Sequence, residues 1–214
     1  MDNLVVVCAD VGSIPKKNFG WWASDEHYGK DLSSLAGFVA QSLNDGRKVA
    51  LGFECPLFVL LHEDEASLTR ARPGEGNRAW CAGAGCGALA TGLVQLAWVL
   101  SAIRQAILVP VEPYLSWSSF ERAAHGLLLW EAFVSGPGKI VSTDNLDVHV
   151  VDARAGAQAF VCALPEPTRA NAIDADVTNV YSLAGAALLR AGWSAEPALL
   201  SQPCLVLRAT APQA

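Results

Sequence analysis

The sequence has no hydrophobic run long enough to cross a membrane, and it is poor in charge. Charged residues make up 17% and hydrophobic residues 52% of its 214 residues. The longest apolar run is Leu89–Val99. It is interrupted by Thr91, Gly92 and Gln95, whereas a membrane span needs about 20 apolar residues. We therefore expect no membrane segment. The start Met1–Asn3 lacks the positive region of a signal peptide, so we expect a cytoplasmic protein.

Cysteine pairs of the kind that bind zinc are also missing. Six cysteines are scattered along the chain, mostly within apolar stretches. Only Cys81 and Cys86 lie close together, and no CxxC or CxxH spacing accompanies them. We interpret the cysteines as buried free thiols, because neither a zinc site nor a disulfide framework has this pattern.

An excess of basic residues is absent as well, since the formal net charge is −6. Neutralisation of phosphates by Lys and Arg supplies most of the affinity of non-specific nucleic-acid binders. The charge balance therefore counts against a nuclease without excluding one, because clustered metal-binding acids lower the net charge by themselves. Arg72 and Arg78 are the candidates for substrate contacts with a nucleic-acid backbone. A charged surface loop is the alternative.

The pattern of apolar residues predicts one α/β domain over residues 1–214. Leu4–Ala9 and Lys48–Phe53 are continuous apolar runs typical of strands buried on both faces. Asp31–Asn44 has apolar residues at spacings of three and four, which predicts a helix capped by Asp31 and ended by Gly46. Further strands are predicted at Phe19–Ala23, near His27–Tyr28, and at Ile107–Val111, Gly126–Val134 and Cys204–Ala209, and further helices at Ala88–Ala106, Ser118–Ala124, Leu146–Leu164 and Thr178–Ala191.

Two segments stand apart from this framework. A polar, glycine-rich stretch at about 58–87 predicts a loop or lid. Within it, Gly83–Gly87 lacks the lysine and the preceding strand of a phosphate loop, so we interpret it as a hinge. At about 175–210 we expect a C-terminal helix followed by an edge strand.

Two of the predicted buried strands end in an acidic residue, Asp10 after the first and Glu54 after the other. Ligands of open α/β sheets bind at strand ends, and adjacent parallel strands would bring the two carboxylates side by side. Neighbouring carboxylates repel each other unless a proton or a cation lies between them. Oxygen ligands of this kind suit Mg²⁺ or Mn²⁺. The alternative is that each acid caps a neighbouring loop or helix.

A third candidate ligand lies in the predicted helix Leu146–Leu164. His149 and Asp152 are three residues apart, so both point to one face. The alanines and the glycine that follow are small enough for the helix to approach a sheet closely. Burial of Asp152 would be costly without a partner, and a metal shared with Asp10 and Glu54 would provide one. The alternative places His149 and Asp152 on the solvent-facing edge of the helix.

The stretches VVVCADVGS, ALGFECPL and HVVDARAGAQAF together resemble the RNase H-like superfamily, and within it the RuvC-type resolvases and related uncharacterised families. The resemblance covers about the first 165 residues. It implies a mixed five-stranded sheet flanked by helices. It also implies two-metal phosphodiester chemistry. The metal ligands and catalytic residues that it implies are Asp10, which would bridge the metals, Glu54, Asp152, and His149, which would ligate or shuttle protons.

Other assignments remain open at this point. Asp174 competes with Asp152 as third ligand, although the Asp-Ala context favours Asp152. Glu131, inside a predicted strand, is either a further ligand or a group behind the ligands. Asp10-Val-Gly-Ser also resembles the first phosphate loop of actin-like ATPases and sugar kinases, but those enzymes need two related domains, for which the chain is too short.

These patterns lead to two hypotheses of different classes. The first is a Mg²⁺- or Mn²⁺-dependent hydrolase, a nuclease or phosphodiesterase that acts on a nucleic-acid substrate. The second is a non-catalytic binding or interaction protein that keeps the same fold. The sequence leaves the oligomeric state open.

Overall fold

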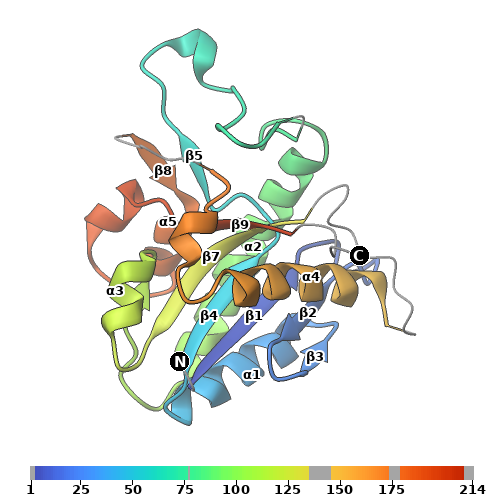
Figure 1. The fold of residues 1–214 in the computed structure, drawn as a ribbon, viewed down its shortest axis with the longest axis vertical. Coiled ribbons are helices and arrows are strands. Elements are labelled where there is room, and N and C mark those ends of the chain that lie inside the picture. The colour runs from blue at the N-terminus through green and yellow to red at the C-terminus, as the bar shows by residue number, and fades with distance from the viewer. Residues whose placement is uncertain (1–2, 77, 135–145, 174–178, 210–214) are drawn as a thin grey trace.

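The computed structural model describes residues 3–76, 78–134, 146–173 and 179–209. Within this part of the chain, the framework is a mixed seven-stranded sheet in the order β3-β2-β1-β4-β7-β6, with β9 beside β7, and five helices accompany it (Figure 1). The predicted mixed α/β architecture is confirmed. The sheet has more strands than the five that the resemblance implied.

The strands are β1 Leu4–Asp10, β2 Gly20–Ala23, β3 Tyr28–Gly29, β4 Lys48–Phe53, β5 Phe58–Leu60, β6 Pro113–Tyr114, β7 Leu127–Phe133, β8 Val180–Ser182 and β9 Val206–Arg208. The helices are α1 Leu32–Asn44, α2 Gly83–Ala106, α3 Trp117–Arg122, α4 Val148–Ala163 and α5 Leu183–Arg190. β5 and β8 pair with each other in a separate antiparallel ribbon.

Strand β1 lies at the centre of the sheet, where it pairs with antiparallel β2 on one side and parallel β4 on the other. Its apolar side chains are buried on both faces, as the continuous run predicted. The odd-numbered residues from Val5 to Ala9 join the core beneath α1, α2 and α5. Val6 and Cys8 join the core beneath α3 and α4. Both faces of β1 are therefore covered by helices (Figure 1).

Helix α4 approaches the sheet closely because its residues facing β1 are small. A Cβ added to Gly156 would lie 2.6 Å from the Sγ of Cys8 and 3.1 Å from the Cβ of Ala132. Both distances are shorter than ordinary packing contacts. The small-residue stretch that suggested a close approach of this helix to a sheet is therefore packed as expected.

Helix α1 begins and ends as its sequence predicts. The side chain of Asp31 accepts a hydrogen bond from the backbone N–H of Ser34 at 2.8 Å. Gly46, just beyond the helix, has a φ of 77°, a conformation that glycine adopts without strain. The following strand β4 then has the predicted bounds.

Three predictions of secondary structure were wrong. Ile107–Val111 forms no strand, because Pro110 has no N–H to donate and Leu108 is 86% exposed. The helix expected at Thr178–Ala191 starts only at Leu183, where the Ser182 hydroxyl caps α5 and β8 precedes it. The expected hinge Gly83–Gly87 is the first turn of α2.

Helix α2 is 24 residues long and apolar enough to meet the length and composition criteria for a membrane span. No such segment was expected from the sequence. One such helix is weak evidence for a membrane, because core helices of soluble proteins meet the same criteria. The inner side of α2 packs against α1 and α5.

Candidate metal centre

Two acidic residues lie together at the carboxyl end of the central parallel strands. Asp10 is the last residue of β1, and Glu54 follows directly after β4. The parallel register pairs Ala9 with Phe53, and the Glu54 N–H donates to the Ala9 carbonyl at 2.8 Å. This pairing brings Asp10 and Glu54 to the same edge of the sheet, as their positions after the strands predicted.

Helix α4 adds a third carboxylate to this edge. Asp152 lies in its second turn and is 3% exposed, while Asp10 is 9% exposed. One carboxylate oxygen each from Asp10, Glu54 and Asp152 lies within 4.8 Å of the other two. Oxygens this close can share one cation after a small inward movement of the side chains, because two ligands at about 2.1 Å from the same ion lie at most about 4.2 Å apart. The three residues can therefore hold a metal ion, and the alternative of a solvent-facing Asp152 is wrong.

The electrostatics of the group favour a bound positive charge. Burial raises the pKa of Asp10 above its ordinary value, and the Asp152 carboxylate raises it further. Hydrogen bonds with His149 and Glu54 act in the opposite direction without cancelling the rise. A cation between the carboxylates would offset the burial, and the smaller repulsion from Asp152, that raise the pKa of Asp10.

His149 is hydrogen-bonded to the first of these acids. Its Nδ1 lies 2.6 Å from Oδ2 of Asp10. The backbone N–H of His149 donates to Oδ1 of Asp147, the N-cap of α4, at 3.0 Å, and Lys30 forms an ion pair with Asp147. Gly20, which pairs with Asp10 across the sheet, leaves room for this turn, because a Cβ there would lie 2.5 Å from the His149 carbonyl carbon.

Glu131 lies on β7, opposite Phe53 of β4, and it is buried. Its Oε1 accepts from Arg72 Nη2 at 2.5 Å, and its Oε2 accepts from Arg72 Nη1 at 2.8 Å. The Leu57 N–H also donates to Oε2, at 3.0 Å. Both oxygens thus accept hydrogen bonds from protein donors, whereas the oxygens that converge come from Asp10, Glu54 and Asp152.

The two predicted substrate-binding arginines lie in different environments. Arg72 is 1% exposed, so the expected surface position is wrong: its guanidinium binds Glu131 and Glu75 inside the protein. Arg78 is exposed and lines the cavity described below. The remaining candidate, Asp174, lies outside the described residues.

The partner of Arg72 within its own loop, Glu75, was missed by sequence reasoning. Glu75 accepts from Arg72 Nε at 2.8 Å and from the Arg72 backbone N–H at 2.7 Å. The intervening Pro73-Gly74 dipeptide was the available signal, because such pairs form tight turns that bring the flanking residues together. Gly74 has the positive φ, 97°, of such a turn.

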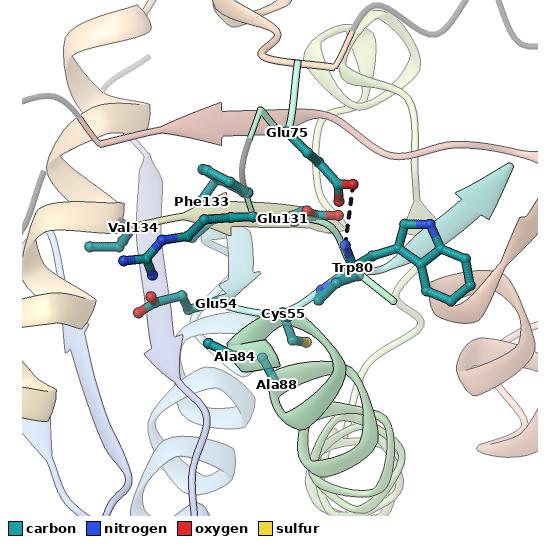
Figure 2. Close-up of a pocket in the computed structure, with 13 residues that line it drawn as sticks. Glu54, Cys55, Glu75, Trp80, Ala84, Ala88, Glu131, Phe133 and Val134 are labelled. Carbon is teal, nitrogen blue, oxygen red and sulfur yellow. Dashed lines mark hydrogen bonds between the residues drawn. The ribbon is translucent and has the colours of Figure 1, made fainter. Parts of the chain in front are cut away.

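A cavity of about 90 Å³ lies beside Glu54, large enough for several water molecules. In Figure 2, Glu54, Phe133 and Val134 lie on one side, Ala84 and Ala88 of α2 lie below, and Trp80 lies on the opposite side. Glu75 and Glu131 also line it. The cavity gives small polar groups room next to one of the candidate metal ligands.

Comparisons with protein-family models, curated proteins and solved structures found no match to this chain.

Proposed function

We propose that the protein is a metal-dependent phosphodiesterase or nuclease with an RNase H-like fold. The convergence of Asp10, Glu54 and Asp152 within 4.8 Å carries the proposal. A mixed sheet with an acid at the end of its central strand supports the proposal, although the sheet has seven strands and not the five that the resemblance implies. The same resemblance suggests a nucleic-acid substrate.

The donor set fits Mg²⁺ or Mn²⁺, because these hard cations prefer oxygen ligands and three carboxylates supply only oxygen. Asp10, Glu54 and Asp152 would hold the metal, which when bound polarises a phosphoryl oxygen and lowers the pKa of water. Three carboxylates leave the rest of an octahedral shell to water and substrate oxygens. Asp10, which is hydrogen-bonded to His149 and Glu54 and lies near Asp152, would be the central ligand.

His149 holds the Asp10 carboxylate in place through Nδ1 and can keep a proton on that nitrogen. An imidazole that binds a ligand carboxylate fixes its orientation, as groups around metal centres commonly do. The side chain of His149 is 25% exposed. It can therefore exchange protons with solvent near the reaction.

The test is hydrolysis of bis(p-nitrophenyl) phosphate and of labelled DNA and RNA, with Mn²⁺, Mg²⁺ or EDTA. We expect metal-dependent cleavage that Asp10→Asn abolishes without unfolding the protein. Asp45→Asn is the matched control, because Asp45 lies on the surface at the end of α1. Full activity of Asp10→Asn would refute the proposal. Mn²⁺ binding without cleavage of any of these substrates would favour the alternative, a non-catalytic binding protein.

A further inference from the structure

Three charged side chains form a buried cluster behind the candidate metal centre: Arg72, Glu75 and Glu131. Arg72 binds Glu131 with two nitrogens and Glu75 with the third. It also donates to the carbonyl of Phe58 at 3.0 Å. The side chains of all three are at most 1% exposed, and a buried cluster of charges persists only if its hydrogen bonds are satisfied.

The cluster reaches the metal centre through the segment that follows Glu54. The backbone of Glu54 is fixed on one side, where its N–H donates to Ala9 at 2.8 Å. Three residues later, the Leu57 N–H donates to Glu131 at 3.0 Å. Pro56 between them has a fixed φ. Glu54 is thus held between β1 and the carboxylate of Glu131.

The opposite face of this segment is fixed independently of Glu131. The Leu57 carbonyl accepts from the N–H groups of Leu183 and Ala184 at 2.8 and 2.9 Å. Cys55 packs against α2 at Gly92, where an added Cβ would lie 2.3 Å from its Sγ. Loss of Glu131 should therefore change the position of Leu57 and Glu54 locally while the segment remains folded.

We propose that Glu131 is a positioning residue: clamped by Arg72, it fixes Leu57 and thereby orients Glu54 toward a divalent cation shared with Asp10 and Asp152. This inference rests on the metal centre proposed above. In this role Glu131 is no ligand: its charge is paired with Arg72, its oxygens accept from Arg72 and Leu57, and the convergent oxygens come from the other three acids.

The same cluster links this position to the loop over the site. Glu75 accepts from the N–H of Trp80 at 3.2 Å as well as from Arg72. Trp80 is fixed further by its indole N–H, which donates to the Arg70 carbonyl at 3.0 Å. One buried arginine thus holds both the segment after Glu54 and the loop that borders the cavity.

The experiment is a titration of the full chain with Mn²⁺, followed by the electron paramagnetic resonance signal of the free ion. The variants are Asp10→Asn, Glu131→Ala, Glu131→Gln and Leu100→Ala. Leu100→Ala is the control for lost stability, because Leu100 is fully buried in α2 away from the acids. Urea unfolding of each variant shows how much stability was lost.

We expect Glu131→Ala to weaken Mn²⁺ binding by about 10- to 100-fold, the usual effect of removing a group that orients a metal ligand. Glu131→Gln should recover part of this loss, because its amide oxygen can still accept from Leu57. Leu100→Ala should bind within about twofold of the wild type, since cavity formation in a remote core leaves the ligands in place.

The outcomes separate the two proposals. A wild-type protein that binds no Mn²⁺, or an Asp10→Asn variant that binds it normally, would overturn the metal centre itself. If Asp10→Asn loses Mn²⁺ binding as expected, but both Glu131 variants bind Mn²⁺ with the affinity of the wild type, the positioning role is overturned and the metal centre is retained. If Glu131→Ala fails to fold, Glu131→Gln alone decides, because unchanged affinity in that variant overturns the inference.

Discussion

Replacement of Arg72 by methionine tests whether the buried cluster stabilises the fold. Methionine has a similar length but no charge, so Glu75 and Glu131 would keep their carboxylates in the interior without a counter-charge. Four side-chain hydrogen bonds disappear, with lengths of 2.5, 2.8, 2.8 and 3.0 Å. Removing one partner of a buried ion pair costs about 3–5 kcal/mol, which is a large part of a typical folding free energy.

This loss should be measurable in two ways. For a chain of this length it corresponds to a Tm lower by about 6–20 °C. Urea unfolding, followed by circular dichroism and by the fluorescence of the seven tryptophans, gives the free energy directly. The slope of the urea dependence should stay unchanged, because the variant alters an interior contact and not the surface exposed on unfolding.

Two controls decide whether charge is the cause. Arg47→Met removes a partly exposed pair with Asp25, whose side chains are 32% and 27% exposed, and should cost at most about 1 kcal/mol. The double variant Arg72→Met/Glu131→Gln removes one of the stranded charges and should be more stable than Arg72→Met alone. A loss below about 1 kcal/mol in Arg72→Met, or no recovery in the double variant, would refute the reasoning.

Two further predictions concern the acids and the helix beside them. Gly20→Ala should weaken Mn²⁺ binding, because the added Cβ would lie 2.5 Å from the His149 backbone. The control Gly37→Ala should leave Mn²⁺ binding unchanged, because Gly37 on α1 faces open space. Equal Mn²⁺ affinities of the two variants would contradict the packing argument. In EDTA, Asp10→Asn should raise the free energy of unfolding at pH 7 and leave it unchanged near pH 3. Burial raises the Asp10 pKa above its ordinary value of about 4, so between the two pKa values only the folded protein holds the proton, and stability falls as pH rises. The measurement is chemical denaturation at both pH values. If the stability difference between Asp10→Asn and the wild type instead grew toward pH 3, folding would lower the pKa of Asp10 and the prediction would be wrong.

The parts of the fold that follow from local pattern were predictable from the sequence. β1 and β4 are continuous apolar runs, so their burial and the acids at their ends could be read directly. Asp152 could be found because small residues around it indicated contact with a sheet. These signals depend on residues close together in the chain, where periodicity and residue size are visible.

The errors arose where distant residues decide the outcome. Arg72 was expected on the surface because no residue near it in the sequence indicates its partner. That partner is Glu131 of β7, which lies 59 residues further along the chain. β8 was hidden inside a helical pattern, because its pairing with β5 is a long-range contact. Neither the Arg72–Glu131 ion pair nor the β5–β8 pairing produces a periodic pattern within a single segment of the sequence.

The distribution of charge at the strand ends connects the fold to the proposed chemistry. Among the residues that the structure describes, five carboxylates gather there, from Asp10, Glu54, Glu75, Glu131 and Asp152, and they fall into two groups. The rear pair, Glu75 and Glu131, shares the single positive charge of Arg72, whose guanidinium donates to both oxygens of Glu131 and to Glu75. The front three lie around a point that a cation can occupy, and the pKa of Asp10 is raised when none is bound. A fixed arginine suits groups that hold the backbone in place, whereas an exchangeable cation suits groups that must leave coordination positions open for water and substrate. This division explains why Glu131, although it lies on a strand next to the ligands, belongs to the support of the site.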